Sequence, residues 1–139
     1  MQKIILDTNV IVSALISSNI PRKILDELVL SKKVLVCLSQ EVFEEYIEVL
    51  NRDKFAKYRD FKAQAEIVLN RLREISRMYT PQREIRVLID TSDNKFLELA
   101  AISTADFLIT GNTSDFTINE FKNTRIVTPR EFLDCVLSS

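Results

Sequence analysis

A chain of 139 residues has the length of one compact domain and can bury a core without disulfides or a structural metal. Hydrophobic residues make up 46% and charged residues 28% of the chain, and one glycine with three prolines leaves little material for linkers, so a single domain spanning residues 1–139 is expected. The net charge of −1 argues against a protein that grips nucleic acid by bulk electrostatics alone.

Two apolar runs near the amino terminus are predicted to be buried strands. Residues 3–6 read KIIL and end at Asp7, and residues 34–38 read VLVCL and end at Ser39. Residues 9–15 and 21–30 lie between these runs and are long enough for helices, and Pro21 suits the first helical position. The beginning of the chain therefore predicts a strand, two helices and a second strand.

Two helices are predicted in the middle of the chain. Ser39 can cap a helix that runs to about residue 51, and a longer helix follows until Thr80 and Pro81 end it. The apolar residues of the longer helix are spaced by alternating fours and threes, which places them on one buried stripe. They are Phe61, Ala65, Val68, Leu72 and Ile75.

Strands and helices continue to alternate toward the carboxyl terminus. Residues 85–89 form a weaker apolar run, residues 93–103 read as helical, and residues 107–110 and 125–127 are predicted strands. Residues 128–131 read TPRE, a capping box with proline at the first helical position, and begin a last helix. This alternation implies an α/β fold with right-handed crossovers and a parallel sheet covered on both faces.

The cysteines and the amino terminus bear on the cellular compartment. Cys37 and Cys135 show no CxxC or CxxH spacing and read as small buried hydrophobes in a reducing compartment. The first residues reach Asp7 without the apolar core of a signal peptide, and no run of 18 apolar residues occurs. A soluble, cytoplasmic protein without a membrane anchor is expected.

Several acidic residues are expected near the carboxyl edge of the sheet, where ligands bind in folds of this kind. Asp7 follows the first strand directly, and Asp115 follows the turn after residues 107–110. A helix cap for Asp7 and a turn residue for Asp115 are equally good alternatives. Asp93 begins a predicted helix, where an acid also stabilises the helix dipole.

Helical geometry selects one glutamate from the helix after Ser39. Residues advance by about 100° around a helix axis, which places Glu45 about 100° from the centre of the apolar face. The other three glutamates lie about 140° to 160° from that centre, so Glu45 alone borders the buried face. Its carboxylate could lean over the sheet edge, although a border glutamate is more often solvated.

Carboxylates that come together from four segments would repel one another unless a cation neutralised them. The chain contains no histidine and no thiol cluster, so an all-oxygen site would suit Mg²⁺ or Mn²⁺ rather than zinc. The absence of histidine excludes Ser-His-Asp and Cys-His nucleophiles, and one glycine cannot form a phosphate-binding loop. Metal-assisted hydrolysis is the chemistry that remains.

The chain resembles the PIN-domain (PilT N-terminus) family, and most closely its branch of toxins from toxin–antitoxin systems. The similarity spans nearly the whole chain and is carried by IILDTNV at residues 4–10, SQEV at 39–42, DNKFLELA at 93–100, TGN at 110–112 with DF at 115–116, and VTPREFL at 127–133. The resemblance implies a three-layer α/β/α sandwich with a parallel five-stranded sheet and a Mg²⁺- or Mn²⁺-dependent ribonuclease site.

Carried over position by position, the resemblance assigns the catalytic and metal-binding acids. They are Asp7, Glu45, Asp93 and Asp115. Asn9 matches a polar position that supports the first acid. Asn112 stands where many family members carry aspartate, while others have asparagine there and the acid three residues later, as in this chain.

The implied reaction is attack of a metal-activated water on a phosphodiester of single-stranded RNA. Residues 51–86 hold ten Lys and Arg against five Asp and Glu, and without other signs of nucleic acid this stretch would read as a solvated helix face. With the resemblance, its basic residues become expected contacts for RNA phosphates. They are Arg52, Lys54, Lys57 and Arg59.

The expected partners are RNA, a cognate antitoxin protein and a second copy of the chain, for which the apolar residues Ile20, Ile24 and Leu28 offer a surface. A haloacid-dehalogenase-like phosphatase would need a second aspartate where Asn9 stands, and a receiver domain would need adjacent acids that are not evident. The alternatives left open are a catalytically weak PIN-like RNA-binding or scaffold module and an RNA-processing nuclease outside a toxin–antitoxin system.

Overall fold

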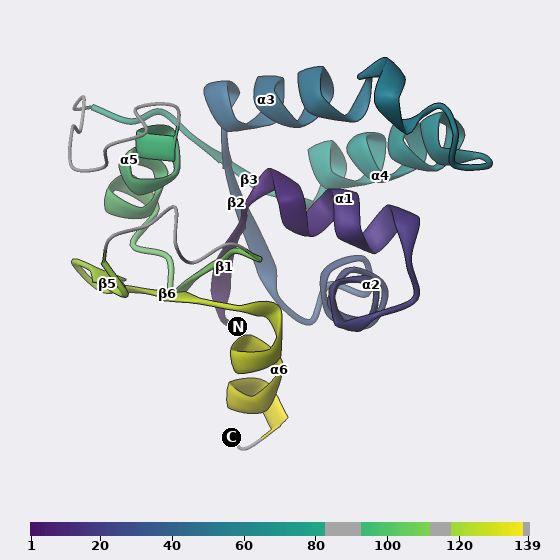
Figure 1. The fold of residues 1–139 in the computed structure, drawn as a ribbon. Coiled ribbons are helices and arrows are strands. Elements are labelled where there is room, and N and C mark those ends of the chain that lie inside the picture. The colour runs from purple at the N-terminus through teal and green to yellow at the C-terminus, as the bar shows by residue number, and fades with distance from the viewer. Residues whose placement is uncertain (83–92, 112–117, 138–139) are drawn as a thin grey trace.

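The computed structural model describes residues 1–82, 93–111 and 118–137 (Figure 1). A π-helical turn, η1 (Ile24–Val29), continues helix α2 (Ile20–Lys23), and a 3-10 turn, η2 (Asp53–Phe55), precedes helix α4 (Phe61–Ile75). The strands are β1 (Lys3–Leu6), β2 (Leu35–Ser39), β3 (Arg77–Tyr79), β4 (Phe107–Ile109), β5 (Glu120–Phe121) and β6 (Thr124–Val127). The helices are α1 (Thr8–Ile16), α2 (Ile20–Lys23), α3 (Gln40–Leu50), α4 (Phe61–Ile75), α5 (Asn94–Ser103) and α6 (Pro129–Leu137).

The described strands form one sheet in the order β3-β2-β1-β4-β6-β5. The first five strands in this order pair in parallel, which confirms the predicted parallel α/β sheet. The short strand β5 pairs antiparallel with β6 and adds a sixth strand to the five that were expected. The register aligns Leu6, Ile109 and Val127, so the segments that follow β1, β4 and β6 begin at the same edge.

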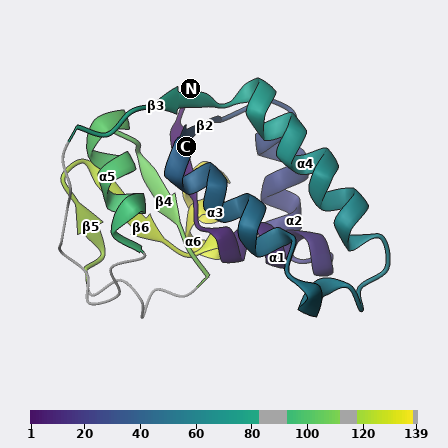
Figure 2. The same ribbon diagram turned by 90° about the horizontal axis from the view of Figure 1, so that it is seen from above.

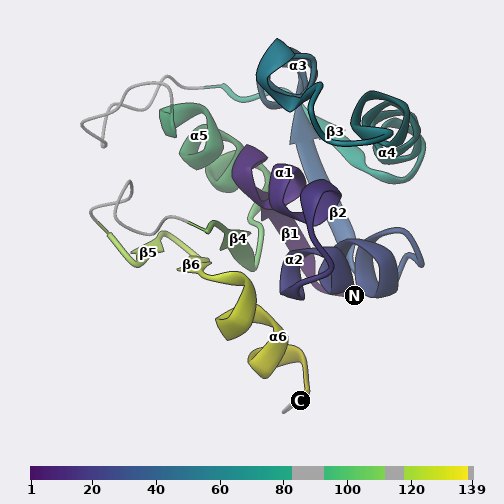
Figure 3. The same cartoon turned by 45° about the vertical axis from the view of Figure 1, so that its right-hand side comes forward.

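The helices cover both faces of the sheet. The chain moves from β1 to β2 to β3 in one direction and then crosses back to β4, so right-handed crossovers place α1 to α4 on one face and α5 on the other. Figures 1 and 2 show α5 on one side of the central strands and α1, α3 and α4 on the opposite side. In Figure 3, α3 and α4 lie side by side over α1, and all three are in contact. The predicted three-layer arrangement is therefore confirmed.

Local sequence signals explain where several elements begin. The Ser39 hydroxyl accepts a hydrogen bond from the Val42 amide at 3.2 Å, so the predicted cap of α3 is confirmed. At the start of α6, the Glu131 amide donates to the Thr128 hydroxyl and the Thr128 amide donates to the Glu131 carboxylate, as in a capping box. Four of the five apolar stripe residues of α4 are buried, and Ile75 packs partly buried against the core.

Two segments differ from the sequence-based expectation. The third parallel strand is β3, whose side chains at Arg77 and Met78 are exposed, whereas the apolar run at residues 85–89 lies outside the described residues. The segment 21–30, predicted as one helix, consists of α2 followed by the π-helical turn η1. Within it Ile24 is fully buried in the core, so only Ile20 and Leu28 of the three proposed contact residues are partly exposed.

The described residues settle two further points. Among the described residues neither Cys37 nor Cys135 forms a disulfide: Cys37 is fully buried, as expected, whereas Cys135 is only partly buried. None of the described helices has the length and apolar character needed to cross a membrane.

Candidate active site

Asp7 is a buried carboxylate at the junction of β1 and α1. It occupies the N-cap position of α1, but its side chain does not form the capping hydrogen bond that was the alternative explanation for an acid here. One carboxylate oxygen, Oδ2, instead accepts a hydrogen bond of 2.7 Å from the Thr110 hydroxyl, just after β4. Only 5% of Asp7 is exposed, and Thr110 is fully buried. The sheet reverses its strand order between β1 and β4, which is where ligands bind in open α/β sheets.

Glu45 extends from α3 toward the same edge of the sheet. Its Oε2 atom accepts a hydrogen bond from the Thr8 hydroxyl, on the residue next to Asp7. Its Oε1 atom forms an ion pair of 2.9 Å with the Lys95 ammonium from α5. The Glu45 side chain is 18% exposed. Glu45 therefore lies at the border of the buried face of α3, as its helical angle predicted, and from there its side chain extends across the sheet edge.

Tyr46 lies fully buried next to these two carboxylates. Its hydroxyl donates a hydrogen bond to the Leu6 carbonyl, directly before Asp7. Burial raises the pKa of Tyr46 well above its ordinary value, and the negative charges of Asp7 and Glu45 raise it further. The phenol is therefore held in its neutral, hydrogen-bond-donating form beside the two acids.

The remaining predicted site residues are placed less centrally or lie outside the described chain. Asp93 is the half-buried N-cap residue of α5 and makes no side-chain capping bond, and Asn9 is exposed on the first turn of α1. Asp115 and Asn112 lie outside the described residues. Within residues 1–82, 93–111 and 118–137, no group of three or more His, Cys, Asp or Glu side chains could hold a metal ion.

Sequence reasoning missed four side chains that lie around Asp7 and Glu45. Thr8, Thr110 and Lys95 bind the two carboxylates directly, and Tyr46 fixes the strand end before Asp7. A signal existed for Tyr46, because a phenol on the buried face of α3 needs a polar partner. No comparable signal marked Lys95, since its contact with Glu45 depends on the position of α5 relative to α3.

The donor atoms at this edge suit a hard cation in their chemistry. The carboxylates of Asp7 and Glu45, with the hydroxyls of Thr8 and Thr110, form an oxygen-only set of the kind that Mg²⁺ and Mn²⁺ prefer. The site therefore fits such an ion in donor type, and Asp7 and Glu45 are the two described carboxylates at this edge that would hold it. The Lys95 ammonium already places one positive charge next to the Glu45 carboxylate.

The connection between α3 and α4 exposes basic side chains that lie over more buried aromatic rings. Lys54 lies over the Phe55 ring and Lys57 over the Tyr58 ring, with 5.2 Å and 5.4 Å from the ammonium nitrogens to the ring centroids. Neither lysine forms an ion pair with any residue of the described chain, whereas Arg52 pairs with Glu48 and Arg59 lies 3.9 Å from Asp60. Among the described residues, the ammonium groups of Lys54 and Lys57 therefore contact aromatic rings and no carboxylate.

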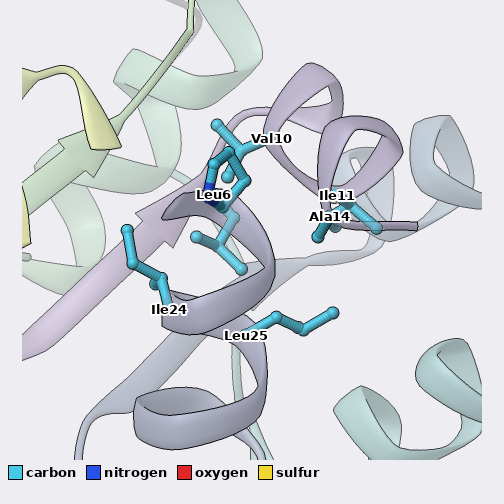
Figure 4. A pocket seen from close by; sticks show the side chains of 7 residues that line it. Leu6, Val10, Ile11, Ala14, Ile24 and Leu25 are labelled. Carbon is cyan, nitrogen blue, oxygen red and sulfur yellow. The ribbon is translucent and has the colours of Figure 1, made fainter. Parts of the chain in front are cut away.

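An apolar gap beneath α1 does not add to this site. It is bordered by side chains of β1, α1, α2 and η1, including Leu6, Val10 and Ile24 (Figure 4). It leaves no room for a water molecule and has no polar lining. We interpret it as a seam in the core packing.

Comparisons with known proteins agree with this architecture. A family model for the PIN domain matches residues 3–114. An uncharacterized protein of Methanocaldococcus jannaschii is 30% identical over 141 aligned residues, which cover 95% of this chain and 90% of that protein. The crystal structure of VapBC2 from Rickettsia felis, bound to a DNA fragment from their promoter, matches with a TM-score of 0.60 and 17% identity, over 91% of this chain and 98% of that chain. At this identity the structural match shows a shared fold alone.

Proposed function

Because the chain belongs to the PIN domain family, we propose that it is a Mg²⁺- or Mn²⁺-dependent endoribonuclease that hydrolyses phosphodiester bonds of single-stranded RNA. PIN domains are generally nucleases, and nucleases of this family typically use divalent metals. The observation that carries the proposal is the pair of largely buried carboxylates, Asp7 and Glu45, at the carboxyl edge of the sheet. Burying two acids together costs free energy that a structural role does not require.

The chain's own residues have separable roles in this proposal. Asp7 and Glu45 would hold the ion, which supplies Lewis-acid stabilisation of the negative charge that develops on the phosphate. Thr110 and Thr8 orient these two carboxylates through their hydroxyl groups. We propose Asp93 and Asp115 as further ligands, with Asn9 and Asn112 in supporting positions.

The RNA strand is proposed to contact the connection between α3 and α4. Lys54 and Lys57 offer positive charge for phosphates, and the half-buried Tyr58 ring beside Lys57 offers a surface on which a base can stack. Along α3, Leu50 lies about 8 Å from Glu45 at a rise of about 1.5 Å per residue. A single strand that crosses α3 could therefore reach both the lysines and the acids.

We further propose that the nuclease is the toxin of a toxin–antitoxin pair and works in the cytoplasm, with a cognate antitoxin as its partner. The similarity of the sequence to that branch of the family supports this role, and the shared fold with VapBC2 agrees with it. A small neighbouring gene for a DNA-binding protein would be the expected genomic context. If expression of the chain alone did not slow growth, an RNA-processing role would be favoured.

The central experiment measures cleavage and metal binding together. Wild-type protein with Mn²⁺ or Mg²⁺ is expected to cleave a labelled single-stranded RNA, and Asp7→Asn and Asp93→Asn should lower the rate by about 100-fold or more. Mn²⁺ should raise the melting temperature of the wild type by binding its folded state, and Asp7→Asn should remove that gain. Wild-type rates in Asp93→Asn would remove that residue from the site.

A charge-reversal variant separates RNA binding from catalysis. Lys54→Glu with Lys57→Glu should weaken RNA binding and flatten its salt dependence, because fewer counterions are released, while the Mn²⁺ effect on melting stays intact. Lys32→Glu with Lys33→Glu is the matched control, since both lysines are exposed and precede β2 at the opposite edge of the sheet. Equal loss of affinity in both double variants would contradict the assigned RNA contact.

One observation favours a second candidate, a PIN-like RNA-binding module with a weakened site. In the part of the chain that the structure describes, no three acids are close enough to hold a metal ion. This module would bind single-stranded RNA through Lys54 and Lys57 without cleaving it. Metal-independent binding together with undetectable cleavage by the wild type would favour it over the nuclease.

A further inference from the structure

Lys95 forms an ion pair that differs from the others in the described chain. Its ammonium nitrogen lies 2.9 Å from Glu45 Oε1, and the pair joins α5 on one face of the sheet to α3 on the other. The Lys95 and Glu45 side chains are 22% and 18% exposed, whereas every other ion pair among the described residues has both side chains at least 40% exposed. Exposed pairs are weak because water and salt screen them, and this pair is largely protected from both.

Both oxygens of the Glu45 carboxylate are engaged in this arrangement. Lys95 holds Oε1 and the Thr8 hydroxyl holds Oε2. Asp7 lies close enough for its charge to act on the same Tyr46 hydroxyl as the charge of Glu45. Lys95 therefore supplies positive charge to a site where two negative charges share one buried neighbour.

We propose that Lys95 is a positioning residue that acts as the built-in counter-cation of this carboxylate site. It holds Glu45 in place while no divalent ion is bound, and it lowers the affinity of the site for such an ion because its ammonium occupies Glu45 Oε1 and adds like charge. The inference rests on the proposed metal-dependent function, since it concerns the same carboxylates. It identifies Lys95 as a determinant of the metal concentration at which the site fills.

A purely structural ion pair predicts a different outcome. If Lys95 only tied α5 to α3, its loss would destabilise the protein and would leave metal affinity unchanged or weaker, because Glu45 would be less well oriented. If Lys95 is a counter-cation, its loss changes the stability and the metal affinity of the protein in opposite directions. Loss of Lys95 destabilises the metal-free protein by removing the positively charged partner of Glu45, which keeps only its bond to Thr8, and it strengthens metal binding.

The test is calorimetric titration of metal-free, full-length protein with MnCl2, combined with melting curves in the absence of metal. Lys95→Met should lower the Mn²⁺ dissociation constant by about tenfold or more, because a unit charge acts on a divalent ion twice as strongly as on a monovalent one. The same variant should melt at a lower temperature without metal. Lys95→Arg should restore values near those of the wild type because it retains the charge.

Two additional variants keep the result interpretable. Lys23→Met removes one exposed positive charge at the end of α2 and should leave the dissociation constant unchanged. Lys95→Gln retains a hydrogen-bond donor for Glu45 and replaces Lys95→Met if the latter does not fold. It should also bind Mn²⁺ more tightly than the wild type.

The outcomes separate this inference from the proposed function. If Lys95→Met and Lys95→Gln bound Mn²⁺ with wild-type affinity or more weakly, the counter-cation role would be wrong while the metal site would stand. If the wild type and all Lys95 variants failed to bind Mn²⁺, both proposals would fail. If Lys95→Arg bound Mn²⁺ as tightly as Lys95→Met, the charge of Lys95 would not be the cause of the weaker binding by the wild type, and the counter-cation role would be wrong.

Discussion

Tyr46 connects the core of the protein to the candidate site through a single hydroxyl group. Its ring is fully buried on the apolar face of α3, and its hydroxyl binds the Leu6 carbonyl at the end of β1. Burial, and then the charges of Asp7 and Glu45, raise the pKa of Tyr46 above 10. Because the neutral phenol is favoured in the fold, its contribution to stability is fully present below the unfolded pKa near 10 and is lost as pH rises through the folded value.

Tyr46→Phe is expected to lower the free energy of unfolding by about 1–3 kcal/mol, because it leaves the buried Leu6 carbonyl without its hydrogen-bond donor. Urea denaturation at pH 7 measures this change, and the difference from the wild type should stay constant between pH 6 and about 9. Tyr58→Phe, at a half-buried tyrosine, is the matched control and should change stability little. Equal stability of Tyr46→Phe and the wild type would contradict the assigned role.

At the scale of elements, the capping box defines the start of α6. The Glu131 carboxylate accepts the Thr128 backbone amide at 3.0 Å, and this bond lowers the pKa of Glu131, with a further contribution from the Thr128 hydroxyl. A depressed pKa means that the stabilisation is present above the unfolded value near 4.5 and is lost as pH falls through the folded value. The capping box is therefore expected to weaken under acidic conditions.

Thr128→Ala removes the hydroxyl that accepts the Glu131 amide and should destabilise the protein by about 1 kcal/mol, the usual value for an N-cap threonine. The loss should be seen as a lower midpoint of thermal or urea unfolding with an unchanged slope. Thr80→Ala, at an exposed threonine outside helices and strands, controls for the substitution itself. A similar loss in both variants would argue against the cap.

The edge strand β3 shows where local patterns failed to predict an element. Its residues Arg77 and Met78 are exposed and Tyr79 is half-buried, so the segment lacks the apolar run by which the other strands were predicted. It becomes a strand because its backbone pairs with β2, with Leu38 opposite Met78. Backbone pairing at a sheet edge depends on a neighbouring strand and leaves little trace in composition.

At the scale of the whole molecule, a homodimer is proposed. Fully buried Ile24 is part of the core and cannot contribute, but Ile20 and Leu28 remain partly exposed. Other large apolar side chains are well exposed, including Ile67 on α4 at 60% and Met78 on β3 at 52%. Covering apolar surface of this kind favours association with a second copy.

Light scattering at micromolar concentration should therefore return a mass of twice the 16.1 kDa of one chain. The mass should fall toward that of the monomer on dilution if the interface is weak, since association depends on concentration. A mass of 16.1 kDa at every concentration would contradict the homodimer.

The sequence by itself determined the α/β class, most strands and helices, and the caps at Ser39 and Thr128, because apolar periodicity and capping bonds involve residues close together in the chain. It also placed Asp7 and Glu45 at one edge, since parallel strands end together and helical angles select a face. Only the tertiary structure decided that Asp7 binds Thr110 instead of capping α1, and that Lys95 of α5 reaches Glu45, 50 residues earlier. Those contacts follow from strand order and from how helices on opposite faces meet at the sheet edge, which no local pattern encodes.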